Sequence, residues 1–170
     1  MDHAKQLFYL SSGPVLKICC CITPLFTMYS CCCTVTLTIT ADNEVYVYHN
    51  GVEVLSNSDW EKAKAVSMEN ACVLAVKAVD HRDDGNHAGI LASTSNGVES
   101  DASWKCSSEE LPGWHLATFD DSAWSYADVI GQHGDEPWGR INPIDAQAKW
   151  IWASDYTRGG TVYCRKTLCG

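Results

Sequence analysis

The length, composition and charge of the chain limit the classes of protein to which it can belong. Its 170 residues suffice for one domain with a short appended segment, and 46% of them are hydrophobic, which is enough for a core. The chain has 12 Lys and Arg against 21 Asp and Glu, and the resulting net charge of −9 disfavours nucleic-acid binding. No stretch resembles the roughly 18 uncharged apolar residues of a membrane span, so we expect none.

The 10 cysteines indicate an oxidising compartment, and we expect the protein to be extracellular or at the cell surface. Six of them form two triplets near the N-terminus that lack the C-x-x-C spacing of a zinc ribbon. The pairing stays open at this stage, and some thiols are alternatively small buried hydrophobic groups. The disulfide candidates are Cys19, Cys20, Cys21, Cys31, Cys32, Cys33, Cys72, Cys106, Cys164 and Cys169.

Residues 1–33 are an apolar, cysteine-rich extension that we expect to contact another copy of the chain. One interpretation is a hairpin over 17–21 and 31–35, turning at Thr23-Pro24, in which the middle thiol of a triplet faces another subunit. A signal peptide is the alternative, but Pro24 interrupts the apolar stretch and no small-x-small cleavage site follows. The expected intersubunit contacts are the apolar residues Leu7, Phe8, Tyr9, Leu10, Val15, Leu16, Ile18, Leu25, Phe26 and Tyr29.

From Thr34 to the C-terminus, short alternating segments separated by turn residues predict a second unit, an all-β domain over 34–170. Asn50-Gly51 is the strongest hairpin signal, and the nearly continuous apolar run over 72–79 predicts a central strand. The predicted strands cover 34–40, 44–48, 52–54, 63–68, 72–79, 88–93, 149–152 and 161–168. Two segments lack this alternation and are expected to be irregular: 101–124 and 131–143. The pattern as a whole is typical of an antiparallel β-sandwich.

Several segments of this β domain match a known pattern in order. They are 41–51, 76–92, 113–124 and 148–152 with 163–168. The most specific is the Phe-Asp-Asp-Ser-x-Trp element that ends at Trp124. Together they resemble the galactose-binding-domain-like jelly rolls found beside many glycoside hydrolases and in extracellular proteins. The resemblance covers about residues 34–168 and implies an antiparallel jelly-roll β-sandwich with an N-terminal Cys-rich extension. It implies no reaction, because such domains bind sugars, bind calcium or pack against their neighbours.

Tryptophans in predicted loops are the candidate sugar-binding residues. Sugar rings present apolar C–H faces that stack on aromatic side chains, and Trp60, Trp114 and Trp138 lie outside the predicted strands. Packing in the core or against another subunit is the alternative for each of them. Trp124 and Trp150 belong to the family motifs and are expected to be buried anchors.

The acidic loop over 80–87 is a weak candidate for a metal site. Asp83, Asp84 and Asn86 lie around Gly85 and could contribute oxygen ligands to Ca²⁺. The loop lacks the twelve-residue register of an EF-hand, and a solvated loop is the favoured interpretation. We therefore expect no cofactor, with calcium as the alternative.

No known catalytic constellation is present in the sequence. It has no G-x-S-x-G, H-E-x-x-H, P-loop or G-x-G-x-x-G motif. The adjacent carboxylates Glu109 and Glu110 are a poor acid pair, since adjacent residues seldom face each other across a sugar. We expect no enzymatic activity.

Two functions remain at this stage. The favoured one is a non-enzymatic extracellular structural protein whose copies self-assemble into a homopolymeric fibril or matrix. The extension over 1–33 would form the contact between subunits, and disulfides would stabilise it. The alternative is a lectin-like carbohydrate-binding module that recognises glycans through its loop tryptophans.

Overall fold

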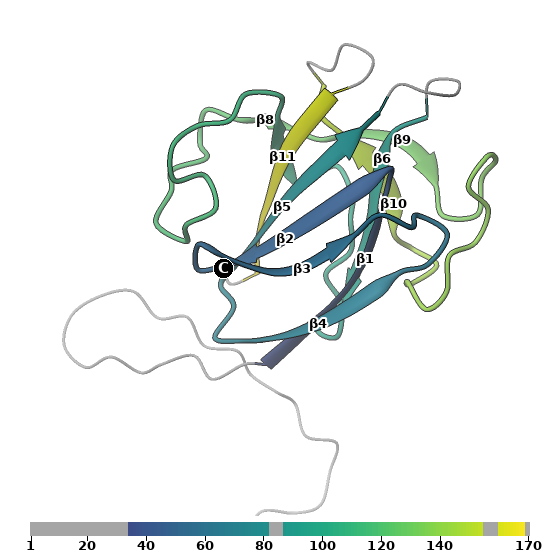
Figure 1. Cartoon of the computed structure of the whole chain (residues 1–170), viewed down its shortest axis with the longest axis horizontal. Coiled ribbons are helices and arrows are strands. Elements are labelled where there is room, and N and C mark those ends of the chain that lie inside the picture. Colours follow the sequence, from purple (N-terminus) through teal and green to yellow (C-terminus); the bar gives the residue numbers. More distant parts are fainter. Residues whose placement is uncertain (1–33, 82–86, 155–159, 169–170) are drawn as a thin grey trace, which may run out of the picture.

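The computed structural model describes residues 34–81, 87–154 and 160–168 (Figure 1). These residues form two antiparallel sheets, with no helix among them, which confirms the predicted all-β sandwich. The strands are β1 (Thr34–Asp42), β2 (Glu44–His49), β3 (Val52–Asn57), β4 (Lys64–Glu69), β5 (Val73–Asp80), β6 (Gly89–Thr94), β7 (Lys105–Ser107), β8 (Ser125–Tyr126), β9 (Asp128–Gln132), β10 (Lys149–Trp152) and β11 (Gly160–Thr167).

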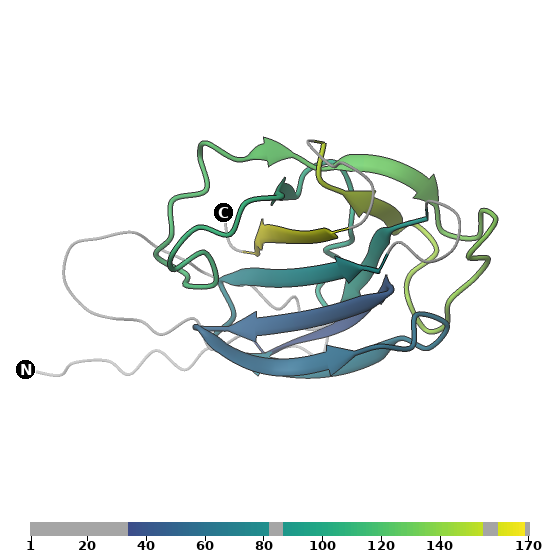
Figure 2. The same cartoon turned by 45° about the horizontal axis from the view of Figure 1, so that its top comes forward.

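The strand order places the edges and the centre of each sheet. One sheet has the order β4-β1-β6-β10-β9, and the other has the order β3-β2-β5-β11-β7-β8. Figures 1 and 2 show β2, β5 and β11 side by side in the second sheet. β5 is therefore a central strand, as its apolar run predicted, whereas β9 lies at the open edge of the first sheet.

The core lies between the two sheets. In β1 the alternation of Thr with apolar residues directs Val35, Leu37 and Ile39 inward, where they are 2%, 0% and 0% exposed. The facing sheet contributes Val76 and Val162 to the hydrophobic cluster that contains Leu37 and Ile39. Period-two alternation is what a half-buried strand requires, so the sequence pattern and the packing agree.

Three short strands lie where the sequence predicted irregular structure or a loop. β7 lies within the expected irregular segment over 101–124, β8 directly follows that segment, and β9 overlaps the expected loop over 131–143. β9 was missed because its side chains are mostly exposed, so it shows no alternation of apolar and polar residues. It is a strand because it pairs with β10, the next strand, which follows after the connection over 133–148.

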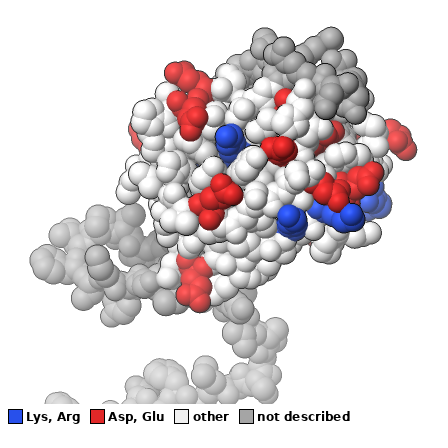
Figure 3. Space-filling view, viewed as in Figure 1, with Lys and Arg blue, Asp and Glu red and all other residues white. Residues whose placement is uncertain are grey.

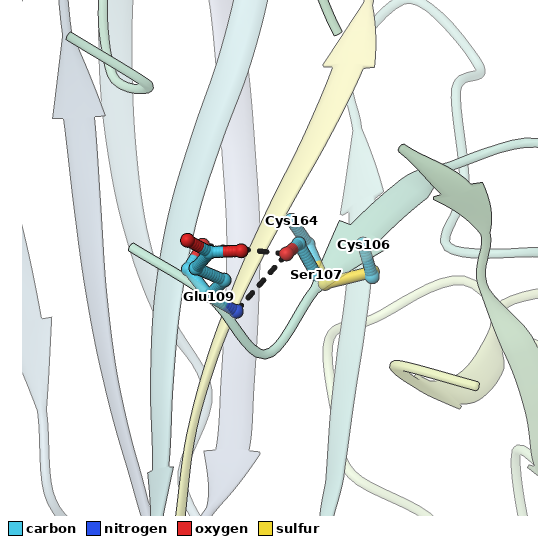
Figure 4. The surroundings of a disulfide bond; sticks show 4 residues. All are labelled: Cys106, Ser107, Glu109 and Cys164. Carbon is cyan, nitrogen blue, oxygen red and sulfur yellow. Dashed lines mark hydrogen bonds between the residues drawn. A yellow bond between two sulfur atoms is a disulfide. The ribbon is translucent and has the colours of Figure 1, made fainter. Parts of the chain in front are cut away.

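One disulfide, Cys106–Cys164, joins β7 to β11 across a sequence separation of 58 residues (Figure 4). The two cysteines are direct partners in the antiparallel register. Beside them the Glu109 backbone N–H donates to Ser107 Oγ at 3.0 Å and closes the turn that follows β7. Cys72 is a free, partly buried thiol. The remaining candidate cysteines, namely the two N-terminal triplets and Cys169, lie outside the described residues.

Residues 1–33 and their apolar contact residues also lie outside the described part of the chain. The division into an extension and a β domain over 34–170 therefore stays a prediction. In the described ranges there is no helix with the length and apolar character that crossing a membrane requires.

Candidate functional site

A cleft of about 240 Å³ opens at one end of the sandwich, beside the edge strand β9. Its volume lies below the roughly 300–1,000 Å³ of pockets for drug-sized ligands, so it suits a small ligand. The described residues that line it are His87, Ala88, Asp128, Ile130, Trp138, Trp152, Ala153 and Ser154. They come from the segment before β6, from β9, from the loop between β9 and β10, and from the end of β10.

Strand pairing brings the walls of the cleft together. β9 runs antiparallel to β10, with Asp128 opposite Trp152 in the register. Asp128 and Ile130 both line the cleft. The register between β9 and β10 shifts between Trp150 and Ile151, so Ile130 lies in a bulge where the strict alternation of side chains is interrupted. Ile130 is 42% exposed, which leaves an apolar surface open beside the carboxylate.

Trp138 forms an aromatic wall of the cleft and is held on several sides. Its ring stacks on Trp150 with centroids 4.5 Å apart and planes 24° apart. Its indole Nε1 donates a hydrogen bond to Asp42 Oδ2 at 2.9 Å. The ring of His87 approaches it edge-on at 5.7 Å. Because these contacts fix the ring before any ligand arrives, binding would cost little side-chain entropy at this position.

Two glycines let the strands lie close to this aromatic pair. A Cβ at Gly131 in β9 would stand 3.3 Å from Trp138 Cζ3. A Cβ at Gly89 in β6 would stand 2.8 Å from Trp150 Cε3 and 3.1 Å from Ile130 Cδ1. At Gly89 a larger residue would force the Trp150 ring to shift, whereas at Gly131 Trp138 would have to give by only a few tenths of an ångström.

A polar network at the turn between β1 and β2 lies behind Trp138. Asp42 is 8% exposed, and its Oδ1 accepts a hydrogen bond from Asn43 Nδ2 at 2.9 Å. Asn43 Oδ1 in turn accepts from the backbone N–H of His81 at 2.8 Å. The His81 ring lies 2.9 Å from Glu44 Oε1. Hydrogen bonds from Tyr46 and then from His81 lower the pKa of Glu44. The network connects the β1–β2 turn to the end of β5.

The structure places the three candidate tryptophans in different environments. Trp138 lines the cleft with a small part of its surface, since it is only 7% exposed. Trp60 is partly buried and packs against the same hydrophobic cluster as Trp138, but it does not line the cleft. Trp114 is 2% exposed and packs edge-on against Tyr48 and Tyr163, so neither face of its ring is free to stack on a sugar. The three residues therefore do not form one site.

The expected anchors Trp124 and Trp150 are buried, at 7% and 0% exposed. The candidate calcium ligands Asp83, Asp84 and Asn86 lie outside the described residues. Within the described ranges no group of three or more His, Cys, Asp or Glu side chains is placed to hold a metal ion.

Sequence reasoning missed most of the residues that line the cleft. Asp128 and Ile130 stand in a segment without clear alternation, and their juxtaposition with Trp138 depends on the pairing of β9 with β10. A signal was nevertheless present. The Asp-Val-Ile-Gly-Gln run at 128–132 has two β-branched residues just before a Gly- and Pro-rich segment, which is compatible with a short edge strand.

Comparison with family models gives no match. Among curated proteins, an α-L-rhamnosidase of Streptomyces avermitilis is 30% identical over 133 residues, which is 68% of this chain and 13% of that enzyme. Among solved structures, the apo form of a lectin from Pleurotus ostreatus matches with 30% identity and a TM-score of 0.56. The same lectin in complex with GalNAc matches equally well. Both lectin matches cover 66% of this chain and 36% of the lectin chain.

The described domain is an antiparallel β-sandwich, and its similarity to the lectin and the rhamnosidase is consistent with the galactose-binding-like module that the sequence motifs predicted. The chain spans about a third of the length of the lectin and about an eighth of the length of the rhamnosidase.

These similarities correct the favoured function. The prediction of a fibril-forming structural subunit is wrong, because the neighbours favour the carbohydrate-binding alternative. The apolar side chains from which assembly was predicted belong to residues 1–33, which lie outside the described part of the chain.

Proposed function

We propose that the β-sandwich is a lectin-like carbohydrate-binding module whose cleft binds one sugar residue of a glycan. The observation that supports this function is the juxtaposition of an apolar surface with an exposed carboxylate, Asp128, in one small cleft. The apolar surface consists of the exposed Ile130 and the small exposed part of Trp138. A sugar ring needs both partners, since its C–H faces are apolar and its hydroxyls are polar.

Each wall of the cleft has a role in this proposal. Ile130, Trp138 and Ala153 offer apolar contacts to the C–H face of the ring. Asp128 accepts hydrogen bonds from hydroxyls, and Ser154 can donate or accept them. Polar and apolar groups thus share the lining about evenly, which suits a ring that has both C–H faces and hydroxyls.

The similarity to a lectin that has been solved with GalNAc supports binding of this kind. The proposal is binding without catalysis. Among the described lining residues Asp128 is the single carboxylate, whereas hydrolysis of a glycosidic bond commonly uses a pair.

We further propose that the protein acts outside the cell or at its surface. The buried Cys106–Cys164 disulfide supports an oxidising compartment. Glycans exposed at cell surfaces would be accessible to the module there.

The test is calorimetric titration of the full chain with galactose, GalNAc, glucose, mannose, fucose and rhamnose, with tryptophan fluorescence as a second readout. Ile130→Ala should weaken binding of the best sugar several-fold, because it removes an exposed apolar contact at the cleft. Val52→Ala is the matched control, since Val52 is 65% exposed on β3, beyond the hairpin at the far end of β2. Absence of binding to every sugar in the panel would refute the proposed function.

A further inference from the structure

We propose that the cleft selects sugars by charge and favours a hexosamine with a free, protonated amino group over its neutral counterpart and over a uronic acid. This inference rests on the proposed function. It starts from Asp128, whose carboxylate is exposed at the cleft and forms no ion pair with any described residue.

The placement of Asp128 suits an amino group on a ring that stacks against the apolar wall. Asp128 and Ile130 are both exposed on β9 and line the same cleft as Trp138. A sugar ring packed on Ile130 and Trp138 would therefore present a ring substituent to the carboxylate. An ammonium group at that position makes a charge-assisted hydrogen bond, which is stronger than the bond from a hydroxyl.

The charges around the cleft also favour a cationic ligand. His87 is the one other ionisable group among the described lining residues, and none of them is Lys or Arg. Behind Trp138, Asp42 places a second carboxylate 2.9 Å from the indole nitrogen. The whole chain has a net charge of −9, and Figure 3 shows acidic groups spread over one face with few basic ones between them. This field attracts a cation and repels a carboxylate.

The size of the effect follows from the exposure of Asp128. An ion pair between solvent-exposed groups gains little over a neutral hydrogen bond, so the expected preference for the amine is about two- to fivefold. A uronic acid should bind more weakly than the neutral sugar by a similar factor. Both differences should shrink at high salt, because exposed charges are screened within a Debye length of about 10 Å at 0.1 M.

The experiment titrates the full chain with galactosamine, galactose and galacturonic acid at pH 7.0, in 20 mM and 300 mM NaCl. The galacto series is used because the solved lectin complex contains GalNAc. At this pH an amine with a pKa near that of an α-amino group, about 7.7, is mostly protonated. The expected order of affinity is galactosamine, galactose, galacturonic acid, and the differences should be smaller in 300 mM NaCl.

Asp128→Asn tests whether the carboxylate is the cause. This nearly isosteric change should bring the galactosamine-to-galactose affinity ratio close to one, whereas Glu53→Gln, an exposed carboxylate on β3, should leave that ratio unchanged. An equal affinity of the unmodified chain for amine and neutral sugar, or a preference that persists in Asp128→Asn, would overturn charge selection. If Asp128→Asn binds neither sugar, the test is the affinity of the unmodified chain at the two salt concentrations. If the galactosamine-to-galactose affinity ratio is the same in 20 mM and 300 mM NaCl, charge selection is overturned. Galactose binding in these cases would still support the proposed function, whereas no binding of any sugar would refute both.

Discussion

Replacing Arg165 by alanine should destabilise the β-sandwich more than any surface substitution of a charged residue. Arg165 lies on β11, and its guanidinium is almost fully buried, at 2% exposed. Its Nε donates to Asp121 Oδ2 at 2.8 Å. Its remaining nitrogens donate to backbone carbonyls of the loop before β8: Trp114, Leu116 at 3.0 Å and Phe119 at 3.3 Å. One side chain thus holds residues 114–121 of the irregular segment against β11.

The magnitude follows from these contacts. Removing one partner of a buried ion pair costs about 3–5 kcal/mol, because the other charge and its hydrogen-bond partners stay desolvated. The Asp121 side chain is 23% exposed and keeps Lys105 at 3.7 Å, so we expect the lower end, about 3 kcal/mol. With a urea m-value of about 1–3 kcal/mol/M, the unfolding midpoint should fall by about 1–3 M.

Urea unfolding followed by circular dichroism and tryptophan fluorescence measures this change. The matched control is Lys62→Ala, which breaks an ion pair of the same 2.8 Å length with Asp59. There the side chains are 80% and 45% exposed, so little change in midpoint is expected. If Arg165→Ala lowers the midpoint no more than Lys62→Ala does, burial does not determine how much this ion pair contributes to the free energy of unfolding.

Three further predictions concern the disulfide, a buried tyrosine and calcium. Reducing Cys106–Cys164, or replacing both residues by alanine, should lower the free energy of unfolding by about 2–4 kcal/mol in urea melts with and without dithiothreitol, and equal melts would contradict this. Burial, followed by the hydrogen bond to Glu110, raises the pKa of Tyr163 to about 12. The folded state therefore disfavours ionisation of Tyr163, so its contribution to stability is complete below pH 10 and is lost as the pH rises to about 12. Tyr163→Phe should flatten that decline in melts across this range, and an unchanged slope would refute the assignment. If the loop over 80–87 binds Ca²⁺, millimolar CaCl₂ should raise the melting temperature and EDTA should reverse the rise, whereas identical melts would exclude it.

The strands that could be predicted from the sequence are those whose pattern is local. β1 alternates Thr with inward apolar residues, and Asn50-Gly51 fixes the hairpin between β2 and β3 through positive φ angles of 51° and 86°. β9 could not be predicted in the same way. It is an exposed edge strand, and its pairing with β10 follows a long irregular connection.

The candidate site shows the same limit. Trp114 and Trp138 both lie in loops, and nothing near them in sequence distinguishes the buried ring from the one that lines a cleft. The difference arises from tertiary packing, since Trp114 is enclosed by Tyr48 and Tyr163. Asp128 gains its role only from its neighbours across the cleft, so no local pattern could assign it.

The hydrogen bond from Trp138 to Asp42 joins residues 96 positions apart, and this has a consequence for how the cleft forms during folding. Contacts between distant parts of a chain form slowly, because the intervening loop must lose entropy before the contact stabilises it. On a ribosome the cleft cannot form until β10 has emerged, since that strand supplies Trp150 behind the ring and Trp152 in the wall. A gene fragment ending before Trp152 would encode Asp128, Ile130 and Trp138 but not Trp152, Ala153 and Ser154, so its cleft would lack part of one wall.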